Sequence, residues 1–414
     1  MIRKNVKKCF SMVEPFPLFS LYLFYFGNDK YKKFHKNIIK VKTGKLVNPE
    51  FFMSAVLNAV TWYLYRFWKI LFTIAAKRCG QINKERNIPV LKQILDIFSL
   101  NLLYQIPPFA YCRYKLYIKE NRENIHKFIF RSDLPCFHDY INRNVCGNYE
   151  KLIADKQLFS AELNKLNIPS IKTICVADRN TEADMYFRKY DIFCKPVCGS
   201  QSRNAFKLKF ISDENRYEIH PVNGKKILGK NKITSFLKQI TGNEKLLLQD
   251  CLKDHQCLSK INNSEEITTL RIITAEFKDK QISPIYMQLE VPVETKHEKN
   301  FKQFYRIYPL DLDIFEVNKN WKRQTKVKYD KNIIIPESLK KLMAESVKHC
   351  LNAHKNLLHL KSAAFDLALT PGGPVIIEAN YNWNTEMLYN IINTEPLTYN
   401  ENIPASLWLR EQMN

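Results

Sequence analysis

The stretch FDLALTPGGPVIIEANYN, at residues 365–382, has a pattern that few folds satisfy. Two apolar runs flank the segment TPGGP, and paired glycines supply the positive φ angles that a tight hairpin needs. If pairing is symmetric about Gly372, Asp366 faces Glu378 and Leu369 faces Val375. The pattern therefore predicts a β-hairpin with one carboxylate on each arm.

Because side chains alternate across a strand, this hairpin has one wholly apolar face and one face that carries polar groups. The apolar face is predicted to contain Phe365, Leu367, Leu369, Val375, Ile377 and Ala379. The other face is predicted to contain Ala364, Asp366, Ala368, Ile376, Glu378 and Asn380.

The two acidic residues raise a question of charge. Directly opposed side chains have Cβ atoms roughly 4.5–5.5 Å apart, so two carboxylates repel each other there unless a cation lies between them. Asn380 adds a neutral oxygen on the same face. Mg²⁺ binds such oxygen ligands, so Asp366, Glu378 and Asn380 are candidate metal ligands. The alternative is an ordinary hairpin whose polar face meets solvent.

Composition limits the classes of protein to consider. The 414 residues suffice for two or three domains, and the formal charge is +23. Residues 1–150 hold 25 Lys/Arg and 10 Asp/Glu, so most of the excess positive charge lies there. The 11 cysteines have no zinc-type spacing, which favours reduced thiols in a cytoplasmic protein. Glu14, Pro15 and Pro17 interrupt the apolar stretch Phe10–Phe26, so no signal peptide is expected.

The N-terminal region is aromatic, basic and predicted to be helical. Its most apolar segment, Phe51–Ala76, is interrupted by Arg66 and Lys69 and is predicted to be either a buried core helix or a helix in a membrane interface. The basic runs Lys30–Lys45 and Lys77–Arg86 would face anionic lipid, a polyanionic substrate or solvent. Asn87–Leu103 has helical spacing.

The composition changes near Cys146, where strand and helix patterns begin to mix without a regular βαβ order. This mixture predicts an α+β fold. Helices are predicted at Asp155–Leu166 and Pro336–Leu360, and strands at Ile171–Val176, Asp191–Val197, Lys245–Gln249 and Thr268–Phe277. A long polar loop is expected from there to about Lys302, and the loop Gln288–Tyr308 is a candidate for substrate specificity.

Two further motifs carry chemistry. DIFCKPVCGSQ, at residues 191–201, is a strand that leads through Lys195 into a Gly-Ser turn, which is typical of a phosphate-binding loop but is weak evidence alone. TTLRIIT, at residues 268–274, places Arg271 in an apolar strand, where it needs an anionic partner. A structural salt bridge is the competing interpretation for Arg271.

In order along the chain, these residues resemble the ATP-grasp superfamily, and in particular its sugar-transfer-associated group from polysaccharide gene clusters. The resemblance covers roughly Cys146–Pro396, and its most specific parts are AAFDLALTPGGPVIIEAN and NNSEEITTLRIIT. It implies two α+β subdomains that grip ATP, at residues 146–244 and 245–405, after a helical N-terminal region at residues 1–145.

The resemblance also implies roles for individual residues. Lys156 and Lys195 would contact phosphates, as would Gly199 and Ser200 in the phosphate loop. Gln249, Asp250 and Leu252 would line the adenine site. Arg271 would bind the transferred phosphate, and Asp366, Glu378 and Asn380 would hold Mg²⁺. The loop after Lys195 has Gly199 alone where the family has several glycines, so either Ser200, Ser202 and Arg203 substitute for them or the lid is weaker.

The activity that the resemblance implies is an ATP- and Mg²⁺-dependent carboxylate–amine ligase that acts through an acyl-phosphate. Its partners would be ATP, an amine and a carboxylate such as a sugar acid or glycan, in the cytoplasm or at the inner face of the membrane. Peripheral membrane contact through the N-terminal region is a further expectation. The alternatives are kinase-like phosphoryl transfer and a non-catalytic scaffold. Nucleic acid is not an expected partner, because no binding motif accompanies the basic charge.

Overall fold

The computed structural model describes most of the chain between residues 30 and 384. The described ranges are 30–130, 133–145, 147–182, 185–198, 204–221, 226–259, 261–293, 301–307, 312, 314–317, 336–384, 408–409 and 411–412. The chain divides into two compact units, Met1–Asn144 with Asn382–Asn414, and Val145–Tyr381.

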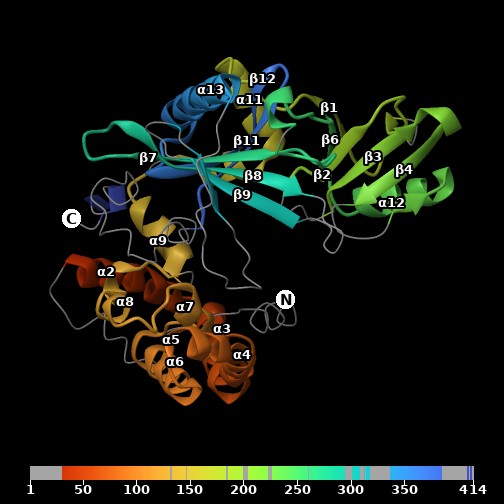
Figure 1. The fold of residues 1–414 in the computed structure, drawn as a ribbon. Helices are drawn as coiled ribbons and strands as arrows, with labels where there is room; N and C mark the ends of the chain where they lie inside the picture. Colours follow the sequence, from red (N-terminus) through yellow and green to blue (C-terminus); the bar gives the residue numbers. More distant parts are fainter. Residues whose placement is uncertain are drawn as a thin grey trace. The chain divides into compact units, whose positions relative to one another are not determined.

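The first unit is helical, as predicted (Figure 1). Its helices are α2 (Lys30–Gly44), α3 (Pro49–Thr61), α4 (Phe67–Ile74), α5 (Gly80–Arg86), α6 (Val90–Tyr104), α7 (Pro108–Arg113), α8 (Lys119–Glu123) and α9 (Leu134–Ile141), with short 3₁₀ turns at Lys45–Val47 and Ile125–Lys127. The π-helical turns η3 (Trp62–Arg66) and η4 (Ala75–Cys79) join α3, α4 and α5 into one continuous helix.

Aromatic side chains form the core of this unit. Trp62 is fully buried, and its indole Nε1 donates a hydrogen bond to Asn101 Oδ1 at 3.2 Å. Trp408, near the C-terminus, packs edge-on against Phe137. None of the helices in the described ranges is both long and apolar enough to cross a bilayer.

The second unit contains two antiparallel six-stranded sheets. The first sheet has the order β1-β6-β2-β3-β4-β5. Its strands are β1 (Thr173–Ala177), β2 (Ile192–Pro196), β3 (Phe206–Ile211), β4 (Arg216–Pro221), β5 (Ile227–Leu228) and β6 (Leu246–Asp250), with a 3₁₀ turn at Ser212–Glu214. Helix α12 (Lys230–Thr241) covers one face of this sheet, where Ile233 and Leu237 pack against Cys194 and Leu248.

The second sheet has the order β10-β9-β8-β7-β11-β12. Its strands are β7 (Thr269–Glu276), β8 (Ile282–Val293), β9 (Phe301–Ile307), β10 (Ile314–Val317), β11 (Ser362–Thr370) and β12 (Gly373–Asn380). The accompanying helical elements are α10 (Tyr149–Ala154), α11 (Lys156–Lys165), η9 (Gln256–Leu258), α13 (Glu337–Ala353) and η10 (His354–Leu358). The predicted α+β class is therefore confirmed.

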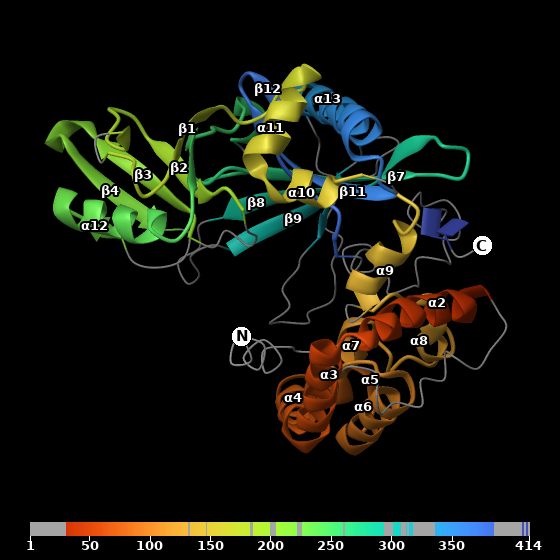
Figure 2. The same ribbon diagram turned by 180° about the vertical axis from the view of Figure 1, so that it is seen from behind.

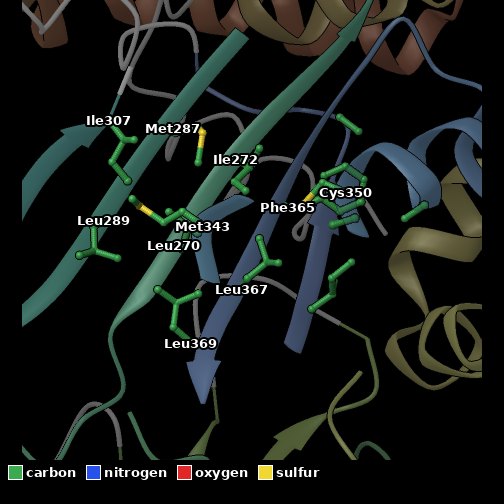
Figure 3. Close-up of a cluster of buried hydrophobic side chains, with 14 of the residues drawn as sticks. Leu270, Ile272, Met287, Leu289, Ile307, Met343, Cys350, Phe365, Leu367 and Leu369 are labelled. Atoms are coloured by element: carbon green, nitrogen blue, oxygen red, sulfur yellow. The ribbon is translucent and has the colours of Figure 1, made fainter. Parts of the chain in front are cut away.

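Alternation along these strands separates an apolar face from a polar one. Leu270, Phe365 and Leu367 point into a core that Met343 and Cys350 of α13 complete (Figure 3). Phe159 and Leu163 of α11 belong to the same core, so α11 and α13 both contribute to it (Figure 2). Asp155 caps α11, because its Oδ1 accepts hydrogen bonds from the backbone N–H groups of Gln157 and Leu158.

The hairpin forms, with a correction to its register. Asp366 pairs with Glu378 and Ala364 with Asn380, as predicted, but Leu369 pairs with Pro374 rather than Val375. A bulge beyond Asp366 leaves Ile377 unpaired. Ile376, and not Ile377, therefore joins Phe365 and Leu367 in the core. Of the paired glycines, Gly373 has φ 106°, a conformation that a side chain would strain.

The polar loop predicted from residue 278 to about Lys302 is wrong in large part. β8 and β9 occupy most of this segment and pair from Met287–Ile307 to Val293–Phe301. The subdomain boundaries predicted at residues 244/245 and 405 also differ from the structure. β6 follows residue 245 but lies between β1 and β2 in the first sheet, and residues from Asn382 onward belong to the helical unit.

Candidate active site

A row of polar side chains crosses four strands of the second sheet. In register, Glu378 on β12 pairs with Asp366 on β11, Asp366 with Arg271 on β7, and Arg271 with Gln288 on β8. Directly paired residues in antiparallel strands point to the same face of a sheet. The four side chains therefore lie together on the face opposite the core.

Arg271 is the centre of this row. Its Nε and Nη2 donate to the two carboxylate oxygens of Asp366 at 2.7 and 2.8 Å, and its Nη1 lies 3.5 Å from Glu290 Oε1. Burial alone would lower the pKa of Arg271, but the hydrogen bonds and charge of Asp366 outweigh it and raise that pKa. The structural salt bridge considered for Arg271 is thus present, and it is bidentate.

The three predicted metal ligands lie on this face. Asp366 and Glu378 oppose each other directly, and Asn380 Nδ2 lies 3.3 Å from Glu378 Oε1 as a donor. An ionised carboxylate has about four lone-pair sites, so the contacts with Arg271 leave Asp366 able to ligate a cation. Among the described residues, no group of three or more His, Cys, Asp or Glu side chains could hold a metal. The donor set here is two carboxylates and an amide, which fits Mg²⁺ better than a softer metal.

Lys195 reaches this region from β2 of the other sheet. Its side chain is 8% exposed, and burial lowers its pKa to about 8, with Glu378 raising it and Lys156 lowering it. Lys195 therefore lies within electrostatic reach of both residues. The backbone N–H of Lys156 donates to the carbonyl oxygen of Val197 at 3.3 Å, which ties the start of α11 to the end of β2.

The predicted adenine-site residues follow one another at the end of β6. Gln249 pairs with Phe193, and Lys195 with Leu247, so Gln249 and Lys195 share a face of the first sheet. Gln249 is 3% exposed, and its buried Oε1 has no hydrogen-bond partner in the part of the chain that the structure describes. An unsatisfied buried oxygen is costly, so this atom is suited to accept a hydrogen bond from a ligand.

The remaining predicted residues are less informative. The backbone N–H of Asp250 donates to the carbonyl oxygen of Lys172 at 3.4 Å, and Leu252 is half-buried just beyond β6. Gly199 and Ser200, together with the neighbouring Ser202 and Arg203, lie outside the described residues.

The structure adds residues of β8 that sequence reasoning left in a loop. Tyr286, Gln288 and Glu290 are buried and hydrogen-bonded in series, from the Tyr286 hydroxyl to Gln288 and from Gln288 Nε2 to Glu290. Lys302 Nζ lies 3.3 Å from Glu290 Oε2. The signal was present in the sequence, since YMQLEV alternates polar and apolar residues with the period of a strand.

Comparison with known proteins gives structural likenesses only. No family model matches the sequence, and a search of curated proteins found no match. Three solved structures with a similar arrangement are a D-alanine-D-alanine ligase from Coxiella burnetii, the ATP-grasp ligase PsnB complexed with minimal precursor, and an L-amino acid ligase from Bacillus licheniformis.

The likeness to all three is weak. Their TM-scores are 0.35, 0.36 and 0.38, and their sequence identities are 10%, 13% and 12%. The alignments cover 64%, 73% and 71% of this chain, and 57%, 76% and 58% of the respective ligases. The chain thus spans less than two thirds of the first of these ligases.

Proposed function

We propose that the unit Val145–Tyr381 is an ATP-grasp module and that the chain is an ATP-dependent carboxylate–amine ligase. One observation carries the proposal. Asp366 and Glu378 oppose each other beside Arg271, and the buried Lys195 of the other sheet lies within electrostatic reach of Glu378. Acidic metal ligands and cationic phosphate ligands are both required to bind a nucleoside triphosphate with Mg²⁺.

The proposed roles follow from chemistry and position. Lys156 and Lys195 would neutralise phosphate oxygens, with Gly199 and Ser200 of the phosphate loop. Gln249 would accept a hydrogen bond from the adenine amino group through its unsatisfied Oε1, beside Asp250 and Leu252. Arg271 would bind the transferred phosphoryl group, for which a planar guanidinium suits two oxygens at once.

Asp366, Glu378 and Asn380 would hold Mg²⁺. When bound there, the metal ion would neutralise negative charge on the phosphates. The Arg271–Asp366 ion pair holds the carboxylate in a fixed orientation. Such preorganisation lowers the cost of binding, because the side chain has little freedom left to lose.

The reaction would proceed in two displacements. An oxygen of the substrate carboxylate attacks the γ-phosphorus of ATP, and the bond from that phosphorus to the bridging oxygen breaks, which yields an acyl-phosphate and ADP. The amine then attacks the acyl carbon, inorganic phosphate leaves, and the amine loses a proton to give an amide. Binding and charge stabilisation by Lys195 and Arg271 would supply most of the catalysis.

The acid substrate is proposed to be a sugar acid or glycan of surface polysaccharide biosynthesis, and the site of action the cytoplasm. The resemblance to the sugar-transfer-associated group supports the first point, and the excess of Lys and Arg in the N-terminal region suits an acidic glycan. All nine cysteines in the described ranges are free, which accords with a reducing compartment.

The test is to incubate the purified chain with ATP, Mg²⁺ and combinations of sugar acids and amines, and to measure ADP and amide. ADP release that requires both substrates supports ligation. Release that requires the acid alone, with a stable phosphorylated product, indicates kinase-like transfer instead. If neither a labelled nucleotide nor any acid binds, the chain is a non-catalytic scaffold and the proposal is wrong.

A further inference from the structure

An unusual surface lies along the continuous helix of the N-terminal unit. Between residues 52 and 72, every exposed residue except Lys69 is apolar or aromatic. These residues, here called the apolar helix face, are 41–76% exposed and comprise Phe52, Met53, Leu57, Val60, Leu64, Tyr65, Trp68 and Phe72. Single exposed apolar residues are normal on proteins, but a contiguous set indicates a binding surface.

The residues follow helical spacing. From Met53 to Phe72, members of the face recur every three or four positions through α3, η3 and α4. At about 1.5 Å per residue, the face is about 28 Å long. The opposite side of the same helix is buried, with Trp62, Phe67 and Leu71 in the core. The helix is therefore apolar on both sides, and folding of the unit accounts for only one of them.

Helix α6 widens this surface. Leu91 and Leu95 are 68% and 57% exposed, one turn apart. One further turn along, Phe98 stacks on Trp68 with ring centroids 5.9 Å apart and an interplanar angle of 22°. The apolar stripe of α6 thus meets the apolar helix face at Trp68.

Basic residues accompany this surface. Residues 49–92 include seven Lys or Arg and two Asp or Glu. Lys69 lies over the ring of Tyr65, with Nζ 5.6 Å from the centroid, and Lys77 is exposed two turns further along. This positive charge complements anionic lipid head groups. It opposes pairing with a second copy, which would bring like charges together with few acids to balance them.

We propose that the apolar helix face lies in the plane of a bilayer interface that contains anionic lipid. Leu64, Trp68 and Phe72 enter the boundary between head groups and acyl chains, while Lys69 and Lys77 contact lipid phosphates. The helix lies along the membrane and does not cross it. This membrane attachment is independent of the ligase site, because no residue of that site belongs to it.

The test uses the full chain and two kinds of vesicle, phosphatidylcholine alone and an equal mixture of phosphatidylcholine and phosphatidylglycerol. We expect co-sedimentation with the mixed vesicles that weakens as salt is raised. The variant Leu64→Asp/Phe72→Asp should lose about tenfold or more of this affinity. The matched control is Tyr190→Asp/Leu228→Asp, which changes two exposed apolar residues of the other unit and should bind like the wild type.

Fluorescence quenching tests whether the apolar helix face itself contacts the bilayer. Brominated phosphatidylcholine in the mixed vesicles should quench tryptophan emission, and Trp68→Phe should remove most of that quenching while circular dichroism confirms folding. Absence of binding to the mixed vesicles overturns the proposal. So does equal binding by wild type and Leu64→Asp/Phe72→Asp, or a wild-type dimer that becomes monomeric in that variant without any change in vesicle binding.

Discussion

The polar groups assigned to the site differ in their surroundings between the two sheets of the second unit. On the second sheet, Asp366 and Arg271 satisfy each other through two short hydrogen bonds, and Glu290 adds a second negative charge. On the first sheet, burial lowers the pKa of Lys195 to about 8, and Gln249 Oε1 has no hydrogen-bond partner among the described residues. The site residues of the second sheet already have charged partners. Those of the first sheet have polar atoms that a bound ligand could pair with.

Asp366 and Arg271 thus support the fold as well as the proposed ligand site, whereas the proposed role of Lys195 and Gln249 is ligand binding. A buried ion pair that loses one partner leaves an uncompensated charge, so Asp366 and Arg271 depend on each other for stability. A buried lysine is retained at a cost, which its lowered pKa of about 8 reflects. Lys195 is therefore the residue whose removal best distinguishes binding from folding.

The largest expected effect comes from the opposed carboxylates. We expect Glu378→Gln and Asp366→Asn each to lower ATP consumption by about a hundredfold or more, because each removes a charged metal ligand. The measurement is ADP release under saturating ATP and Mg²⁺. Glu276→Gln, which changes a carboxylate elsewhere on the same sheet, is the control and should stay active. Retention of more than about a tenth of the activity would contradict the metal assignment.

Stability should distinguish the same two variants. Asp366→Asn should lower the free energy of unfolding by about 2 kcal/mol, because Arg271 loses its charged bidentate partner. Glu378→Gln should have a free energy of unfolding close to that of the wild type, because the ion pairs of Arg271 are with Asp366 and Glu290 and not with Glu378. Urea denaturation measures both, and equal destabilisation would show that the ion pair with Arg271 does not set Asp366 apart from Glu378.

The second prediction concerns Lys195→Met. We expect ATP affinity to fall about 30-fold, the equivalent of about 2 kcal/mol for a charge-assisted contact. The free energy of unfolding should stay level or rise, because a buried cation is replaced by an apolar side chain. Titration calorimetry with ATP and Mg²⁺ measures the affinity, and the control is Lys165→Met, which changes an exposed lysine of α11. A loss of stability with unchanged ATP affinity would show that Lys195 supports the fold and does not bind ATP.

The third prediction is a pH dependence. Lys195 is charged below its pKa of about 8 and neutral above it, so ATP affinity should be highest below pH 8 and fall as the pH rises to 9. Between pH 7 and pH 9 the fall should reach about tenfold, because roughly a tenth of a group remains protonated one unit above its pKa. Arg271 stays charged throughout, because its pKa is raised. In Lys195→Met the dependence should disappear, and a persistent slope there would point to another group.

The smallest expected effect is that of Gln249→Met. Removal of an unsatisfied buried oxygen should raise the free energy of unfolding by about 1 kcal/mol and weaken ATP binding about threefold. Thermal unfolding with and without nucleotide measures both changes. A variant that loses stability in the absence of nucleotide would indicate that Gln249 serves the fold.

The sequence was sufficient for the parts of the site that depend on local pattern. The hairpin, the opposition of Asp366 and Glu378, and the helix that begins near Asp155 all follow from residues close together in the chain. The pairing of Arg271 with Asp366 was not predictable in this way. It depends on β7 lying beside β11 across 95 residues of sequence, and nothing in either strand specifies that neighbour.

The errors also have physical causes. β8 contains Pro284 and Pro292 and carries Gln288 and Glu290, so its composition is that of a loop although its alternation is that of a strand. The register error near the turn arose because equal spacing was assumed on both arms. The structure instead places the unpaired Ile377 between the turn and Glu378, a local rearrangement that composition does not reveal.

That single unpaired residue gives the tip of the hairpin and its acidic end different pairing registers. Between Gly373 and Ile376 the strands follow the register that the tight turn imposes, whereas from Glu378 onward they follow a register one residue apart from it. A change of turn geometry at the tip can thus be absorbed at Ile377 before it reaches Glu378 on β12. The tip is for this reason the natural place to graft a tag or a reporter peptide on this sheet.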